Sequence, residues 1–198
     1  MSRSRTIVGS ACFAWLAVVG AGMASLAYYD QQAGETLAAP ARIAPLAAEA
    51  PKKQRLLVFI HPRCPCSTAS LRELERLMSR CRNEVEAKVY FIRPENEPDS
   101  WARGSLWTLA QQIPGTTTSI DAGGKVSRQY AATTSGAIVV YSADGKLQYQ
   151  GGITAARGHE GDSRGKEAIF AIARGETQEV SQCPVYGCPL WDKASQQE

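Results

Sequence analysis

The sequence predicts an α/β domain with a mixed central sheet, preceded by a single transmembrane helix. Residues 6–29 contain no charged side chain. From Arg55 onward, short apolar runs alternate with segments that repeat apolar residues at helical spacing. The last two apolar runs flank the turn sequence ADG at 143–145, which is a strong hairpin signal. Such alternation implies a partly parallel sheet with helices on both faces.

Composition describes an ordinary globular chain and argues against nucleic-acid binding. The 198 residues are 44% hydrophobic and 21% charged, which is typical of a folded domain. The net charge is only +3, and the sequence pI is about 8.5. No cluster of lysine and arginine is interleaved with aromatic residues, so no nucleic-acid partner is expected.

Residues 1–29 are interpreted as an uncleaved signal-anchor transmembrane helix. The uncharged run exceeds the roughly 20 residues that a helix needs to cross the hydrocarbon core, whereas the apolar region of a secretory signal peptide has about 7–15. Arg3 and Arg5 before the run favour an N-terminus on the inside. Small residues at Ala24 and Ala27 leave cleavage as the alternative. We therefore expect a single-pass protein of a bacterial inner membrane, with its C-terminal domain in the periplasm.

The rest of the chain is predicted to comprise a linker, a folded domain and a tail. Residues 30–53 are rich in alanine and proline and are interpreted as a semi-extended tether. The domain is expected at 54–176 and a cysteine-containing tail at 177–198. Five of the cysteines lie outside the anchor, where an oxidising compartment permits disulfides. The odd number leaves one thiol over or shared, and Cys81, on an apolar helical stripe, is expected to be a core thiol.

The expected order of elements is β-α-β-α-β-α-β-β-α. Strands are predicted at 55–60, 87–92, 116–124 with its turn, 137–142 and 146–152. Helices are predicted at 67–81, 99–112, 125–132 and 164–175. In sheets of this kind, chemistry gathers where the C-termini of strands meet the N-termini of helices. The first such junction carries the sequence HPRCPCSTAS at 61–70.

This first junction carries the strongest chemical signal, a pair of cysteines separated by one residue. Pro65 suits the first position of a helix, which would place Cys64 at the cap. The positive end of the helix dipole stabilises a thiolate there, and Arg63 and a protonated His61 would act in the same direction. Cys64 is therefore expected to be a nucleophile with a lowered pKa. A disulfide to Cys66 would be strained and readily exchanged.

The element order, this cysteine and the segment SIDAGGKVSRQYAATTSGAIVVYSADGKLQYQGGI at 119–153 resemble a thioredoxin-like domain. The resemblance is closest to membrane-tethered TlpA-type thiol–disulfide proteins and to an exported subgroup described as RedB-like, and it covers residues 54–176. It implies a thioredoxin-like fold and thiol–disulfide chemistry.

The sequence also departs from that family pattern. The family's two cysteines are separated by two residues, so alignment of Cys64 with the first puts Ser67 at the second, and Cys66 is an addition. The family's cis-proline before the fourth strand is replaced by Gly136. Such a loss is common in metal-binding and peroxide-reacting relatives, although the sequence before Cys64 does not favour a peroxidase.

Two further segments supply candidate site residues. The glycine-rich loop GGITAARGHEGDS at 151–163 presents polar groups, Arg157 among them, and His159 is expected to act as a base for Cys64 or as a ligand. In the tail, Cys183 and Cys188 are candidates for a local disulfide, with resolution of Cys64 or Cys66 by one of them as the alternative. A soft metal, Cu(I) or Zn(II), could instead be held by Cys64, Cys66, His61 and His159.

The leading hypothesis is a membrane-tethered thiol–disulfide oxidoreductase that needs no cofactor. Cys64 would attack, Cys66 would resolve, and His159 or Arg63 would tune the thiolate, with Ser67 beside them. Its partners would be protein thiols or disulfides, or an electron-donating membrane protein. The alternatives are a copper or zinc carrier resembling Sco-type proteins and a non-catalytic module that binds a partner.

Overall fold

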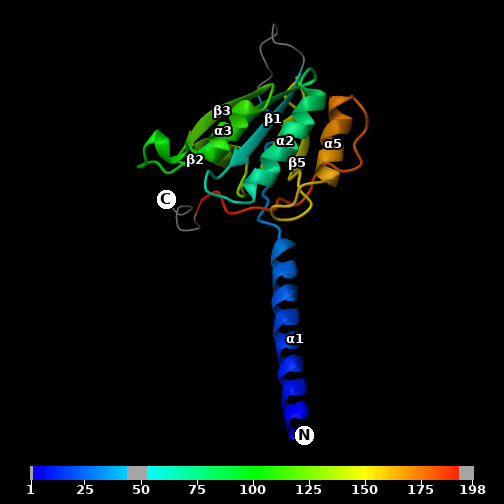
Figure 1. The fold of residues 1–198 in the computed structure, drawn as a ribbon. Helices are drawn as coiled ribbons and strands as arrows, with labels where there is room; N and C mark the ends of the chain where they lie inside the picture. Colours follow the sequence, from blue (N-terminus) through cyan, green and yellow to red (C-terminus); the bar gives the residue numbers. More distant parts are fainter. Residues whose placement is uncertain (1, 44–52, 192–198) are drawn as a thin grey trace. The chain divides into compact units, whose positions relative to one another are not determined.

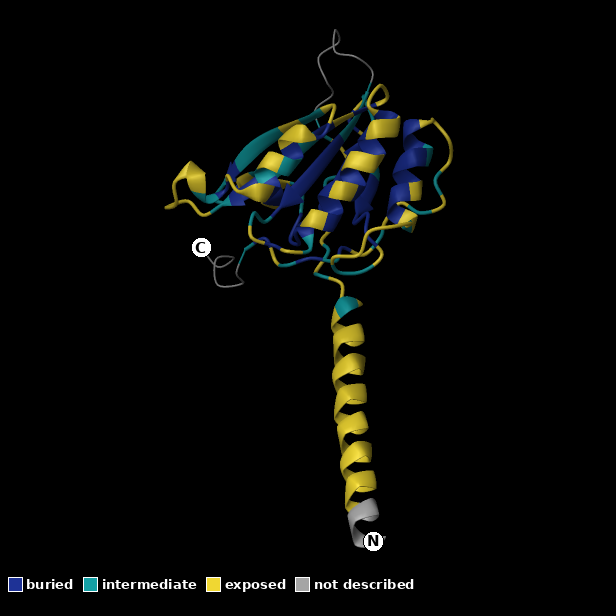
Figure 2. Ribbon diagram, in the orientation of Figure 1, coloured by how far each residue is buried: buried dark blue, intermediate teal, exposed yellow. Residues whose placement is uncertain are grey.

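The computed structural model describes residues 2–43 and 53–191, and it divides the chain into two compact units after Gln32 (Figure 1). The first unit is the helix α1, Ser2–Asp30. Its segment Ile7–Asp30 is long and apolar enough to cross a membrane, judged by length and composition. Nearly all described side chains of α1 are exposed within the structure, as Figure 2 shows.

The second unit is built on one five-stranded sheet with the strand order β3-β2-β1-β4-β5. β1 is parallel to β2 and β2 is parallel to β3, whereas β4 is antiparallel to both β1 and β5. The strands span Gln54–Ile60 (β1), Val85–Arg93 (β2), Thr116–Ala122 (β3), Ala137–Tyr141 (β4) and Leu147–Gly151 (β5). The predicted mixed sheet and hairpin are confirmed, and the fold is thioredoxin-like.

In the described part of the second unit, four α-helices accompany the sheet, and one predicted helix is interrupted. They are α2 (Ser67–Cys81), α3 (Ser105–Gln112), α4 (Lys125–Gln129) and α5 (Arg164–Ala173). The helix predicted over 99–112 is two pieces, a short 3-10 helix at Asp99–Trp101 and then α3. Gly104, at the cap of α3, is extended with φ −119° and ψ −158°, which interrupts a continuous helix.

Alternate residues of the strands face two separate cores. On one face, Leu56 and Val58 pack with the apolar sides of α2, α3 and α5. On the other face, Leu57 and Phe59 pack with α4 and with two segments from outside the predicted domain, which supply Ala39, Val185 and Leu190. The sheet is thus covered on both sides, as the sequence predicted, but helices alone do not cover the second side.

The predicted linker is shorter than expected, because residues 33–43 pack against the domain. The N–H of Ala39 donates to the buried Gln150 Oε1 at 2.8 Å, and the Tyr141 hydroxyl donates to the Pro40 carbonyl at 2.8 Å. Arg42 forms an antiparallel bridge with Lys146 beside β5. These contacts satisfy backbone groups that a solvated tether would leave to water. Residues 44–52 of the predicted linker lie outside the described residues.

Candidate thiol site at the start of α2

The candidate site lies where β1 ends and α2 begins. A tight turn joins them, in which the N–H of Cys64 donates to His61 O at 3.0 Å and that of Ser67 to Cys64 O at 3.1 Å. The helix itself begins at Ser67, with Cys66 at its cap position. The sequence predicted Cys64 as the cap and Pro65 as the first helical residue. The difference arises because the first turn is closed by hydrogen bonds from each residue to the residue three positions earlier, as in a 3-10 helix.

Cys64 is a buried thiol surrounded by hydrogen-bond donors. Only 1% of the residue is exposed. The backbone N–H of Cys188 donates to its Sγ at 3.4 Å, and it also receives hydrogen bonds from the Ser67 side chain and the Cys66 backbone. Burial by itself raises the pKa of Cys64, but these hydrogen bonds outweigh burial, so the pKa of the thiol is lowered. The donors that stabilise the thiolate are therefore neutral groups.

A chain of hydroxyl groups extends the support of this thiolate. The N–H of His61 donates to Ser135 Oγ at 2.7 Å, and the Ser135 and Ser67 hydroxyl oxygens are 2.7 Å apart. Because the His61 amide can only donate, the Ser135 proton is available for Ser67, and the Ser67 proton for Cys64. Such chains polarise one another and strengthen the last hydrogen bond. Ser135 was missed from sequence because it lies 68 residues beyond Ser67.

Arg63 and His61 occupy a different position from the one predicted. The Arg63 guanidinium lies over the Trp101 ring, 4.6 Å from its centroid. The His61 ring meets the same indole edge-on at 5.6 Å, and its Nδ1 accepts the Arg63 N–H at 3.2 Å. The largest causes that act on the pKa of Cys64 are burial and hydrogen bonds, and neither of these side chains supplies one of those hydrogen bonds. The structure thus shows Arg63 stacked on Trp101, and its tuning of Cys64 stays a prediction.

The charged group beside the thiols is Arg157, from the loop after β5. Burial and the neighbouring Cys64 raise the pKa of Cys66, while the charge and hydrogen bond of Arg157 act against that rise. Arg157 also donates from Nη1 to the Gly187 carbonyl at 2.7 Å. His159 of the same loop is exposed, and its Nδ1 lies 2.8 Å from Arg157 O. The loop thus brings Arg157, and not His159, to the cysteines.

Gly136 precedes β4 directly, at the place expected from the family's proline. Its φ of +92° favours glycine, and a Cβ there would lie 2.9 Å from Ser70 Oγ. Its N–H donates to Phe59 O at 2.8 Å, which a proline could not do. No cis peptide bond occurs in the described part of the chain. Glycine at this position therefore allows the backbone conformation of the loop that carries Ser135.

The tail crosses this same loop and delivers Cys188 to the site. The N–H of Ser135 donates to Cys188 O at 2.8 Å, and that of Leu190 donates to Thr133 O at 2.8 Å. Thr134 and Pro189 form an antiparallel bridge between these two contacts. Residues 188–190 therefore pair with residues 133–135 like a short added strand.

Cys183 and Cys188 are free thiols with different neighbours, so the predicted local disulfide is not formed. Cys183 interacts with the buried Tyr149, and its N–H donates to Gln150 O at 3.2 Å. Cys188 instead hydrogen-bonds with Cys64, and burial together with this thiol raises the pKa of Cys188 to about 12. The backbone of Cys183 pairs with β5 and that of Cys188 pairs with the loop before β4, so the two thiols have different surroundings.

The predicted metal ligands do not converge. Among residues 7–43 and 53–191, no group of three or more histidine, cysteine, aspartate or glutamate side chains has an arrangement that could hold a metal ion. His61 faces Trp101, and His159 is exposed and bonded to its own loop. Cys64 and Cys66 therefore lack the imidazole ligands of the predicted set.

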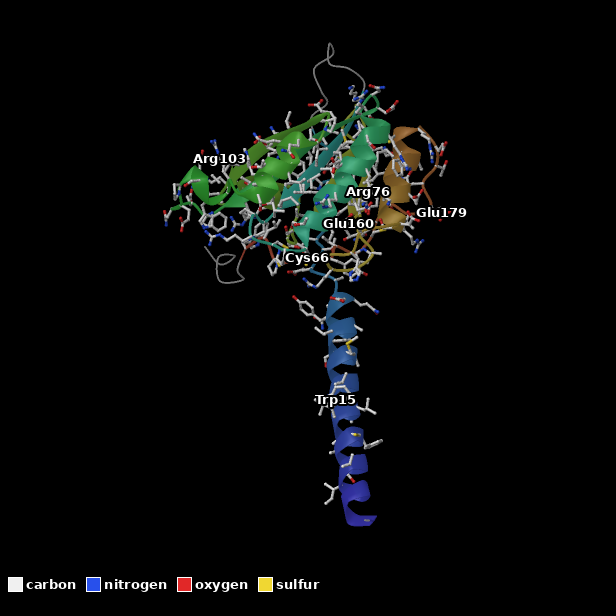
Figure 3. All side chains as sticks on the ribbon, in the orientation of Figure 1. Trp15, Cys66, Arg76, Arg103, Glu160 and Glu179 are labelled. Atoms are coloured by element: carbon white, nitrogen blue, oxygen red, sulfur yellow. The ribbon has the colours of Figure 1, made fainter. Side chains whose placement is uncertain are left out.

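A buried ion pair anchors the loop that carries Arg157. Glu73 of α2 is fully buried, and it lies 2.8 Å from Lys166 Nζ of α5 and accepts the Gly161 N–H at 2.8 Å. Arg76 and Glu160, labelled in Figure 3, form an ion pair at 2.6 Å that joins helix and loop. Burial opposes ionisation of Glu73, but Lys166, Gly161 and Arg76 together lower the pKa of its carboxyl group.

Comparison with known proteins shows the fold. The sequence matches no known family profile and no curated protein. The structure is similar to a hypothetical protein from Sinorhizobium meliloti, with a TM-score of 0.57 at 18% identity, over 82% of this chain and 97% of that one. An uncharacterized conserved protein from Geobacillus kaustophilus is similar with a TM-score of 0.57 at 19% identity, over 82% of this chain and 94% of that one. A secreted Mycobacterium tuberculosis disulfide oxidoreductase has a TM-score of 0.43 at 18% identity, over 63% of this chain and 82% of that one.

Proposed function

We propose that this protein is a membrane-tethered thiol–disulfide oxidoreductase with Cys64 as its nucleophile. The observation that carries the proposal is the setting of Cys64. It is a buried thiol at the start of α2, with its pKa lowered by hydrogen bonds from Ser67, Cys188 and Cys66. The thiolate is the reactive form in disulfide exchange, so a site that favours it favours this chemistry.

The reaction passes electrons between sulfur atoms and requires no cofactor. The Cys64 thiolate attacks one sulfur of a substrate disulfide, the substrate S–S bond breaks, and the other sulfur leaves as a thiolate that takes a proton from water. A second thiol of the site then attacks Cys64 and releases the first sulfur. Two electrons have moved to the substrate, and the protein holds a disulfide. An external dithiol restores the reduced protein, and the reverse sequence oxidises a substrate dithiol.

We infer that α1 anchors the domain in a bacterial inner membrane with the thiol site on the periplasmic side. The support is the length and apolar composition of Ile7–Asp30 and the arginines before it at 3 and 5. Disulfide exchange is useful in such an oxidising compartment. Candidate partners are exported proteins with accessible thiols or disulfides, or a membrane protein that supplies electrons.

The test is the disulfide reductase activity of the full chain in detergent, with insulin as substrate and dithiothreitol as reductant. Cys64→Ser should abolish turnover, because the pKa of Cys64 is lowered whereas the pKa values of Cys66 and Cys188 are raised. Cys12→Ser, in α1, is the matched control and should retain activity. Undiminished turnover in Cys64→Ser contradicts the proposal.

Elemental analysis of the same reduced protein tests the carrier hypothesis. We expect no stoichiometric copper or zinc, because His61 packs on Trp101 and His159 is bonded to its own loop. A bound metal that is lost in both Cys64→Ser and Cys66→Ser would overturn the oxidoreductase assignment in favour of metal transport.

A further inference from the structure

We propose that Cys188, and not Cys66, is the redox partner of Cys64, so that the oxidised protein carries a Cys64–Cys188 disulfide. This inference rests on the proposed function and assigns its second thiol. It also gives the C-terminal tail a role, since the tail then supplies half of the reacting pair although it lies outside the predicted domain.

Backbone pairing fixes the position of Cys188. Two backbone hydrogen bonds join the tail to the loop before β4, one from Ser135 N–H to Cys188 O and one from Leu190 N–H to Thr133 O. Their donors and acceptors are spaced by two residues along each segment, which is the repeat of an antiparallel ladder. A shift by one residue would turn the Cys188 side chain to the opposite face. The register that is formed brings the Cys188 N–H within 3.4 Å of Cys64 Sγ and also allows a hydrogen bond between the two thiols.

A close backbone approach keeps the tail in this place. Gly187 lies so near the Ser135 carbonyl that a Cβ at this position would clash with it. Arg157 holds the Gly187 carbonyl from the opposite loop at 2.7 Å. Leu190 is buried in the second core and fixes the other end of the segment. Contacts on both sides of Cys188 therefore hold its thiol against Cys64.

Cys66 is less suited to close a disulfide with Cys64. The two cysteines are separated by one residue at the start of a helix, so their disulfide would require a small, strained ring. Cys66 also lies beside Arg157 and is only partly buried. Its position suits a surface thiol next to the reacting pair.

The order of events follows from burial and charge. In the reduced protein Cys188 covers Cys64, which is 1% exposed, so residues 187–190 must move aside before a substrate disulfide can reach Cys64. Once Cys64 is in a mixed disulfide it carries no negative charge, and one cause of the raised pKa of Cys188 is gone, whereas Arg157 still favours its thiolate. The returning Cys188 thiolate attacks Cys64 Sγ, forms the Cys64–Cys188 bond and releases the substrate sulfur as a thiolate.

Disulfide mapping of the full chain in detergent tests this assignment. Reduced protein is oxidised with glutathione disulfide, quenched with acid, alkylated, digested without reductant and analysed by mass spectrometry. We expect the cross-linked peptide that contains Cys64 and Cys188 to be the main product. A main product that joins Cys64 to Cys66, or Cys183 to Cys188, overturns the inference, as does the absence of any disulfide at Cys64.

Two matched variants sharpen the result. Cys188→Ser should trap Cys64 as a glutathione mixed disulfide in most molecules, because no thiol resolves it, whereas Cys66→Ser should still form the Cys64–Cys188 bond. Resolution of the mixed disulfide in Cys188→Ser at the wild-type rate contradicts the assignment. Cys188→Ala and a circular dichroism spectrum check that the trapped form is folded.

Failure of the two proposals can be distinguished in the same experiment. If Cys64 reacts with glutathione disulfide and Cys66 then displaces the glutathione to form a Cys64–Cys66 disulfide, the exchange function stands and the choice of Cys188 is wrong. If Cys64 does not react with glutathione disulfide even in Cys188→Ser, the proposed function itself fails, and the inference fails with it.

Discussion

At the scale of single residues, neutral donors control the reactivity of Cys64. The sequence pointed to cationic neighbours, Arg63 and His61, but both side chains pack on Trp101. The thiolate instead depends on Ser67 and on backbone N–H groups, with Ser135 behind Ser67.

Ser67→Ala should raise the pKa of Cys64. A hydrogen bond to a charged group contributes about 1.5–3 kcal/mol, which corresponds to a rise of about 1–2 pKa units. The measurement is the pH titration of thiolate ultraviolet absorbance, taken as the difference from Cys64→Ser. Thr68→Ala, exposed one residue later, should leave the titration unchanged. An unchanged titration in Ser67→Ala would show that Ser67 does not support the thiolate.

Arg157→Gln should raise the pKa of Cys66 further, because the charge and hydrogen bond that oppose the rise are lost. The pH at which iodoacetamide labels the partly exposed Cys66 should therefore increase. His159→Gln, in the same loop, is the control and should have no effect, since His159 is exposed and bonded to Arg157 O. A shift in the control, without one in Arg157→Gln, would show that Arg157 is not the charged group that acts on Cys66.

At the scale of secondary-structure elements, the site depends on segments that pack onto one another across the sheet. The loop after β5 is fixed to α2 and α5 through Glu73 and Lys166, and the tail is fixed to the loop before β4. The strands and helices could be predicted from the spacing of their apolar residues, because that spacing depends on neighbours within one element. The docking of residues 33–43 could not be predicted, because it depends on contacts with distant elements.

Glu73→Gln should destabilise the domain, because it removes the buried carboxylate that pairs with Lys166 and leaves that charge with the exposed Asp162 carboxylate, at 3.5 Å. Removal of one partner of a buried ion pair costs about 3–5 kcal/mol, measured by urea unfolding of the full chain in detergent. Glu75→Gln, exposed on the same helix, should change stability by less than about 0.5 kcal/mol. Equal stability of the two variants would mean that the pair does not hold the loop.

The same pair predicts a pH dependence. The pKa of Glu73 is lower in the folded protein than in the unfolded chain. The stabilisation is therefore fully present above the ordinary glutamate pKa and is lost as the pH falls through the lowered value. Urea midpoints of the wild type should decline over that acidic range, and the decline should be smaller in Glu73→Gln.

At the scale of the whole molecule, the proposed disulfide would join residues that are 124 positions apart. Closing so long a loop restricts the unfolded chain, which stabilises the oxidised protein by up to about 5 kcal/mol. The thermal midpoint in glutathione disulfide should therefore exceed that in dithiothreitol, and Cys188→Ser should abolish the difference. Cys183→Ser should retain it. Equal midpoints for the two redox states of the wild type would contradict the long-range disulfide.

The sequence by itself determined the apolar N-terminal helix, the strand and helix order of the thioredoxin-like domain, and Cys64 at the first strand–helix junction. Each follows from local periodicity or from adjacent residues, so no long-range contact is needed to predict it. Only the tertiary structure decided that Ser135 meets Ser67, that Arg157 meets Cys66 and that Cys188 meets Cys64. These residues come from separate loops and the tail, and the path of each backbone selects which side chain reaches the thiols.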